Sequence, residues 1–232
     1  MNHNPIIVAL DLESAGEARA MVARLGSRID FYKVGMELYA AAGMGIVREL
    51  LDLGKRVFLD LKLYDIPETV KRTVAQVSRS GATFLTVHGV GSVMRAAIAG
   101  RENDGLKLLA VTVLTSFSRE DLHDLGYGCE VSEMVAVRTR QAMSAGVDGV
   151  VASPLEAAAV RRILTPGALL VTPGVRSAGR AQGDQKRVAT PADAVRDGAD
   201  YLVIGRQITR ASDPAEEAAR VLEEIAGASL VV

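Results

Sequence analysis

Short apolar runs alternate with longer amphipathic stretches along the whole chain. Eight runs have the length and composition of buried strands, and they cover residues 6–10, 31–35, 56–62, 83–88, 106–114, 148–152, 168–172 and 200–205. The stretches between them place apolar residues at helical spacing, as Ala18, Met21, Val22 and Leu25 do after the first run. The pattern therefore predicts eight strand–helix units in succession.

The predicted strands are apolar on both faces, which is typical of a parallel sheet covered by helices. Eight such units in 232 residues fit a closed (β/α)8 TIM barrel. A doubly wound open sheet is the main alternative, but it usually has fewer strands in a chain of this length. No linker or shift in composition divides the sequence, so we expect residues 1–232 to form a single barrel domain.

Charged side chains collect where the predicted strands end. In a (β/α)8 barrel the chemistry takes place at the carboxyl ends of the strands, and at or just beyond the ends of the first three stand Asp11, Lys33, Asp60, Lys62 and Asp65. A single charge at a strand end is usually a solvated terminus. Five charges at the same end of three neighbouring strands favour a polar site in the barrel mouth.

The segment FLDLKLYDIPETV (58–70) joins the third predicted strand to its helix. Residues two apart on a strand point to the same face, so Phe58, Asp60 and Lys62 project into the barrel while the alternate leucines face the helices. Lys33 on the neighbouring strand can reach the same space. Carboxylate neighbours favour the ammonium form of a lysine, which is then available as a proton donor. The alternative is a buried ion network that only closes the barrel.

The last two predicted strands are followed by sequences suited to an anion. TPGVR places a glycine turn and Arg176 after the seventh strand, and IGRQI places Gly205 and Arg206 after the eighth. These two loops form the usual phosphate site of the fold, where backbone N–H groups face the anion and arginine pairs with phosphate oxygens. The long segment 172–191 also carries Gln182 and Gln185, which either close over a ligand or stay in solvent.

Composition argues against several other classes of function. The formal net charge is -1, so no global positive field attracts nucleic acid or an anionic membrane. No apolar run reaches the roughly 20 residues that span a bilayer, and the first residues lack the pattern of a signal peptide. We therefore expect a cytoplasmic protein that binds neither nucleic acid nor membrane.

Cysteine and histidine are too sparse for a disulfide or a metal centre. Cys129 is the single cysteine, and no base is evident beside it. His3, His88 and His123 do not have metal-binding spacing, so no metal is predicted. His88 ends the fourth predicted strand, where it either contacts a ligand or packs as a hydrogen-bonded side chain.

Motifs along the whole chain together resemble the orotidine 5'-phosphate decarboxylase family, and its bacterial branch most closely. They are VALD (8–11), YKVG (32–35), DLKLYDIPETV (60–70), VTVLTS (111–116), TPGVR (172–176), GDQKR (183–187) and VIGR (203–206). The DxKxxD element followed by IP is highly specific. Tyr64 departs from the family pattern, in which His or Phe is expected at this position.

The resemblance implies an enzyme that converts orotidine 5'-phosphate to UMP, the last step of de novo pyrimidine synthesis, without a metal or another cofactor. It implies a charged tetrad made of Lys33, Asp60, Lys62 and Asp65, in which Lys62 protonates C6 of the pyrimidine. It also implies a homodimer, in which Asp65 and Thr69 reach across the interface into the partner's site.

The resemblance further implies which side chains hold the substrate. Asp11 and Lys33 would bind the ribose hydroxyls, with Asp60 close to the departing carboxylate, and Thr115 would contact the pyrimidine ring. The phosphate end of the substrate site would comprise Pro173, Arg176, Gln185, Gly205 and Arg206.

Two other readings remain open at this point. Keto-gulonate phosphate decarboxylases and hexulose phosphate synthases resemble the chain at the DxKxxD element, but they use magnesium. A nucleotide-binding regulator on a barrel scaffold is the alternative that is not an enzyme, and an intact lysine–carboxylate cluster argues against it.

Overall fold

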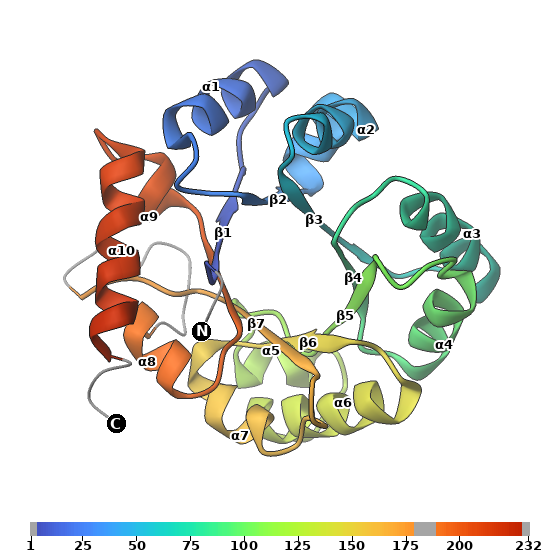
Figure 1. Cartoon of the computed structure of the whole chain (residues 1–232). Coiled ribbons are helices and arrows are strands. Elements are labelled where there is room, and N and C mark those ends of the chain that lie inside the picture. The colour runs from blue at the N-terminus through green and yellow to red at the C-terminus, as the bar shows by residue number, and fades with distance from the viewer. Residues whose placement is uncertain (1–3, 179–188, 229–232) are drawn as a thin grey trace.

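The computed structural model describes residues 4–178 and 189–228. Eight parallel strands pair in chain order and close into a barrel, with the last strand beside the first (Figure 1). They are β1 (Ile6–Ala9), β2 (Phe31–Gly35), β3 (Arg56–Leu63), β4 (Phe84–His88), β5 (Lys107–Val111), β6 (Gly149–Val151), β7 (Leu169–Pro173) and β8 (Tyr201–Ile204). The predicted (β/α)8 barrel is therefore confirmed, and an open sheet is excluded.

Helices surround the barrel (Figure 1). The longer ones are α1 (Ala15–Leu25), α2 (Met36–Asp52), α3 (Pro67–Ser78), α4 (Gly91–Gly100), α6 (Val131–Ala145) and α10 (Pro214–Ala228). The shorter ones are α5 (Arg119–Asp124), the 3-10 helix η1 (Pro154–Glu156), α7 (Ala157–Arg161), α8 (Pro191–Arg196) and α9 (Arg206–Thr209). Among the described residues, no helix is both long enough and apolar enough to cross a membrane.

The pattern of apolar residues missed α5, α8 and α9, and it extended the fifth strand beyond its actual end. The missed helices have six residues or fewer, which is too short for a helical period to show. The helical stretch between β6 and β7 is not one continuous α-helix but η1 followed by the five-residue α7. The fifth strand, expected over 106–114, ends at Val111, because its ladder with β6 stops at the pair Val111–Val151.

Two apolar layers hold the barrel together. The larger lies between the strands and the helices. The smaller fills the barrel interior, where Phe84 packs edge-on against Phe31 and Phe58 with ring centroids 5.0 and 5.8 Å apart. Inward-facing side chains of a barrel of this size form a packed core rather than a pore. The interior cluster therefore closes the barrel below its carboxyl-end mouth.

Partly buried carboxylates brace the opposite, amino end of the strands. Asp148, just before β6, accepts a hydrogen bond from the Leu108 amide at 2.9 Å and pairs with Arg101 at 2.6 Å. Asp200, just before β8, accepts from the Leu170 amide at 2.7 Å and pairs with Arg161. Each carboxylate thus ties the start of one strand to the strand before it.

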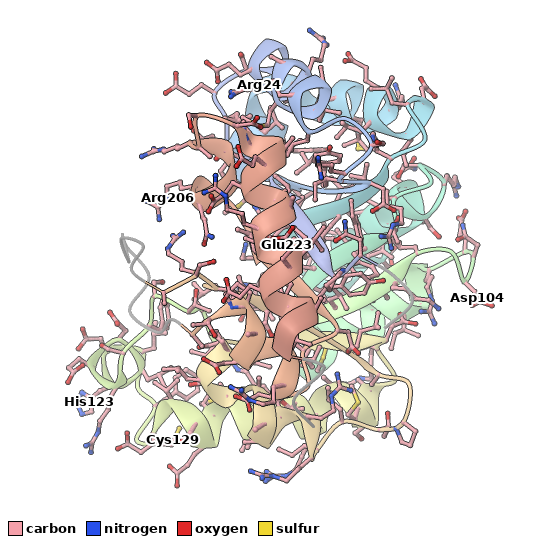
Figure 2. The ribbon with its side chains drawn as sticks, turned by 60° about the vertical axis from the view of Figure 1, so that its left-hand side comes forward. Arg24, Asp104, His123, Cys129, Arg206 and Glu223 are labelled. Atoms are coloured by element: carbon pink, nitrogen blue, oxygen red, sulfur yellow. The ribbon has the colours of Figure 1, made fainter. Side chains whose placement is uncertain are left out.

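Asp148→Ala should lower the free energy of unfolding by about 2–4 kcal/mol, because it leaves the Leu108 amide and Arg101 without their partly buried acceptor. Urea unfolding measures this loss. Asp104→Ala is the control, since Asp104 is exposed on the loop before β5 (Figure 2), and it should change stability by less than about 0.5 kcal/mol. Equal stabilities of the two variants would contradict the bracing role of Asp148.

Candidate active site

A cavity of about 710 Å³ opens at the carboxyl ends of the strands. Its floor includes Ala9, Phe58, Val151 and Val203, which belong to the interior cluster or pack against it. The predicted site residues that line the cavity are Asp11, Lys33, Asp60, Lys62, Thr115, Pro173, Arg176, Gly205 and Arg206. The barrel therefore brings together side chains that lie almost 200 positions apart in the sequence.

Asp60 lies at the centre of a cluster of alternating charges. Its Oδ2 is 2.8 Å from Lys62 Nζ and 3.7 Å from Lys33 Nζ. Lys33 Nζ donates in turn to Asp11 Oδ1 at 2.7 Å. The period-two pattern of β3 predicted that Asp60 and Lys62 share a face, and their contact is in agreement with this.

The lysines keep Asp60 ionised despite its burial. Burial alone would raise the pKa of this carboxyl group, because it disfavours the charged form. The charges of Lys33 and Lys62, with hydrogen bonds from Lys62 and Thr86, outweigh burial and hold the pKa of Asp60 below its ordinary value. Asp60 is therefore a carboxylate at neutral pH and a fixed acceptor for Lys62.

The backbone at Lys62 departs from a regular strand. Among residues 4–178 and 189–228, Lys62 is the one non-glycine residue with positive φ, at 48°. The β3–β4 ladder is also irregular here, because residues 60–62 stand opposite the single residue Thr86. The Lys62 amide donates to the Thr86 hydroxyl at 2.9 Å instead of to a strand carbonyl. Bulges and strained backbone of this kind concentrate at functional sites.

Gly35 makes room for the head of Lys33. A Cβ atom at Gly35 would stand 2.8 Å from Lys33 Nζ and 3.2 Å from Asp11 Oδ1. Both distances are shorter than ordinary van der Waals contacts, so a larger residue would displace the ammonium group. The glycine of the YKVG motif thus allows the Lys33 ammonium group to lie close to the backbone, a role that the sequence pattern alone did not assign.

Two arginines stand at the other end of the cavity, after β7 and β8. Gly174 supplies the turn after β7 with φ of 79°, a conformation that favours glycine. Burial, and then the nearby charge of Arg206, lower the pKa of Arg176. The two guanidinium groups therefore repel each other, and an anion bound between them would relieve this repulsion.

A hydrogen-bond network joins the segments that carry these arginines. Ser177, next to Arg176, donates its amide to Gln207 Oε1 at 3.0 Å, and Gln207 Nε2 donates to Ser177 Oγ at 2.8 Å. Gln207 Nε2 also donates to Glu217 Oε1 at 3.0 Å, and Glu217 is a buried residue of α10. Arg206 accordingly lies beside α10 (Figure 2). No periodic pattern in the sequence indicates this network, because α9 has only four residues.

Not all of the residues singled out in the sequence are among those that line the cavity. Asp65 and Thr69 are exposed and are not among its lining residues. Gln185 and Gln182 lie outside the described residues. His88 packs against the Tyr64 ring with centroids 5.1 Å apart, and burial, then the charges of Arg138 and Lys62, lower the pKa of His88.

Several polar residues of the cavity wall were not predicted. They are Glu13, Glu17, Glu37, Thr209 and Arg210. All of them lie in the loop or helix that follows a strand, where the sequence does not show which side chains turn inward. Thr86 was also missed, although its position two residues before the end of β4 puts it on the inward face with Phe84.

Metal-binding clusters are absent from the part of the chain that the structure describes: no three His, Cys, Asp or Glu side chains are grouped closely enough to hold an ion. Asp11 and Asp60 are instead paired with the ammonium groups of Lys33 and Lys62. The cavity therefore offers a fixed ammonium group at one end and, at the other, two guanidinium groups that can bind an anion.

The sequence matches a known protein family over most of its length. The model of the orotidine 5'-phosphate decarboxylase / HUMPS family matches residues 4–221. This chain belongs to that family. The orotidine 5'-phosphate decarboxylase of Rhodopseudomonas palustris (strain HaA2) is 51% identical over 223 residues, covering 96% of this chain and 95% of the relative. That of Caulobacter sp. (strain K31) is 52% identical over 222 residues, covering 96% and 97%.

Two solved structures have the same fold as this chain. The orotidine 5'-phosphate decarboxylase from Lactobacillus acidophilus matches with a TM-score of 0.84 and 36% identity, covering 96% of this chain and 99% of the other. An uncharacterized conserved protein from Geobacillus kaustophilus matches with a TM-score of 0.82 and 37% identity, covering 95% and 100%. The family match and the relatives named orotidine 5'-phosphate decarboxylase show that the chain is an enzyme of the carboxy-lyase class.

Asp60 should make the stability of the fold depend on acidic pH. Its pKa is lower in the folded chain than in the unfolded chain, so its contribution is complete above the unfolded pKa of about 4 and is lost as pH falls through the folded pKa. In Asp60→Asn the unfolding free energy should therefore fall less steeply below about pH 4 than in the wild type. Urea unfolding at a series of pH values measures these slopes.

Asp124→Asn provides the matched control, because Asp124 is an exposed aspartate on α5. Its slope below about pH 4 should equal that of the wild type. If Asp60→Asn also kept the wild-type slope, the lysines would not be holding the Asp60 carboxylate in its charged form.

Proposed function

We propose that this chain, as a single barrel domain, decarboxylates orotidine 5'-phosphate to UMP in pyrimidine biosynthesis. The observation that carries the proposal is the Lys33–Asp60–Lys62 cluster, with contacts of 2.8 and 3.7 Å. It shares one cavity with Arg176 and Arg206. A nucleotide monophosphate has the matching layout, since its phosphate and its reacting carbon lie at opposite ends.

Lys62 would supply the proton in this reaction. When the bond from C6 to the carboxylate breaks, carbon dioxide leaves and the electron pair stays on C6, where the ring gives it little resonance relief. An ammonium group fixed beside C6 stabilises this developing charge. It then donates a proton to C6, and solvent reprotonates the lysine. Asp60 supports this role by holding Lys62 Nζ at 2.8 Å.

The remaining cavity residues would bind the nucleotide. Asp11 and Lys33, linked at 2.7 Å, would hold the ribose hydroxyls, and Thr115 would contact the pyrimidine. The phosphate group would lie against Pro173, Arg176, Gly205 and Arg206, with Gln185 as a further contact. Binding energy gained at the phosphate, far from C6, can be used to position the reacting carbon.

We further propose a homodimer in which Asp65 and Thr69 serve the partner's cavity. Both residues are exposed in the isolated chain. The apolar side chains on either side of Asp65, Tyr64 and Ile66, are each 67% exposed. Large apolar residues exposed together are typical of an interface. An interface here would cover them and place Asp65 at the cavity of the second subunit.

Turnover without metal should separate this proposal from the magnesium-dependent alternatives of the same family. The purified chain, treated with a chelator and then assayed by the absorbance change on loss of orotidine 5'-phosphate, should keep its full rate. The reason is that the ammonium of Lys62 supplies the electrostatic stabilisation. Loss of activity that only magnesium restores would favour the keto-gulonate phosphate decarboxylase or hexulose phosphate synthase reading.

Mixed dimers should test whether Asp65 acts across the interface. Lys62→Ala and Asp65→Ala should each lose at least about a hundredfold in UMP formation, while Lys62→Ala still binds UMP. After refolding in equal amounts, half of the dimers are mixed, and one of the two sites in each is complete. The mixture should therefore recover about a quarter of the wild-type activity.

A second mixture controls for nonspecific recovery. Lys62→Ala and Asp60→Ala affect the same subunit's cluster, where the two side chains are 2.8 Å apart. No mixed dimer of these variants contains a complete site, so activity should stay at the level of the single variants. Failure of the first mixture to exceed the second would refute a shared site, and near-normal turnover by Lys62→Ala alone would refute the mechanism.

A further inference from the structure

Thr86 occupies the point where the β3–β4 ladder is interrupted. The ladder pairs Leu59 with Leu85 and resumes with Leu63 and Val87, so residues 60–62 face Thr86 alone. The Thr86 side chain is fully buried and points into the barrel on the same face as Phe84. A hydroxyl at this position lies beside the β3 backbone at the point where the regular pairing of β3 with β4 is interrupted.

The Thr86 hydroxyl makes two hydrogen bonds whose directions depend on each other. It accepts the Lys62 amide N–H at 2.9 Å and donates to Asp60 Oδ1 at 2.9 Å. An ionised carboxylate can only accept, and an amide N–H can only donate. The single hydroxyl proton is therefore directed at Asp60, and the oxygen is directed at Lys62.

These bonds close a ring around the proposed proton donor. The Lys62 side chain reaches Asp60 Oδ2 at 2.8 Å, and the Lys62 backbone reaches Asp60 Oδ1 through Thr86. Lys62 also has the left-handed φ of 48°, a conformation that persists in a non-glycine residue only when its surroundings hold it. The Lys62 backbone and the Asp60 carboxylate are thus both oriented by the Thr86 hydroxyl group.

We infer that Thr86 is a positioning residue for decarboxylation, one that fixes the Lys62 backbone and the Asp60 carboxylate without touching the substrate. This inference rests on the proposed function. It adds that the position of the proton donor Lys62 is set from β4, a strand whose residues do not line the cavity. The expected cost of removing the hydroxyl lies in turnover rather than in binding, because the phosphate contacts are remote from Thr86.

Thr86→Val tests the inference, since it keeps the shape of the side chain and removes the hydroxyl. Its kcat should fall about 10- to 100-fold, with KM within about threefold of the wild type. The acid limb of its kcat–pH profile should move to higher pH, because loss of a hydrogen-bond donor raises the pKa of Asp60. Thr86→Ser, which keeps the hydroxyl, should restore most of the rate.

Thr139→Val is the matched control. Thr139 is equally buried, but its hydroxyl donates to the Val135 carbonyl within α6, away from the cavity. Its kcat and pH profile should stay at wild-type values. A kcat of Thr86→Val equal to that of Thr139→Val, or a loss that appears in KM alone, would overturn the inference.

Folding and function are separated by two further comparisons. If Thr86→Val does not fold, Thr86→Ala and Thr86→Ser make the same comparison, since they differ by the hydroxyl alone. If neither the valine nor the alanine variant folds, the hydroxyl is required for folding and the inference is overturned. Absence of turnover in the wild type would overturn the proposed function itself, whereas wild-type turnover with an unaffected Thr86→Val would overturn this inference alone.

Discussion

The site depends on one buried carboxylate held between two ammonium groups. Asp60 is inside the barrel mouth, where a lone carboxylate would be strongly disfavoured, and the two lysines would repel each other without it. Its Oδ2 lies 2.8 Å from Lys62 Nζ and 3.7 Å from Lys33 Nζ. Each charge is stabilised by its neighbours of opposite sign, so the cluster forms only when β2 and β3 pair in the observed register.

The rest of the cavity separates chemistry from anion binding. In the lysine–carboxylate cluster, Asp11 follows β1 and the other members belong to β2 and β3, whereas Arg176 and Arg206 follow β7 and β8. Closure of the barrel pairs β8 with β1 and brings these two halves of the chain around one space. The apolar interior cluster supports both from below, so neither half can shift into the barrel centre. Ser177 and Gln207 tie the two arginine-bearing segments to each other and to α10.

The sequence predicted those features that follow from regular periods. Strand order, the inward direction of Asp60 and Lys62, and the arginines after the last two strands all follow from period-two alternation and from where strands end in a barrel. Helices of four to six residues are too short for a helical period to be recognised in the sequence, as α5, α8 and α9 illustrate. The role of Thr86 was not predicted, because it depends on a register shift between β3 and β4 that the pattern of a single strand does not show.

That register shift shows why the site is where regular structure ends. A left-handed lysine costs about 1–3 kcal/mol, and an interrupted ladder leaves a backbone N–H to be satisfied. At the amino ends, Asp148 and Asp200 reinforce regular pairing by accepting amides of the neighbouring strands. At the carboxyl end, the Thr86 hydroxyl accepts a hydrogen bond from the freed Lys62 amide and donates one to Asp60. The strain is thus confined to one residue, and its compensation simultaneously orients the carboxylate that holds the ammonium group.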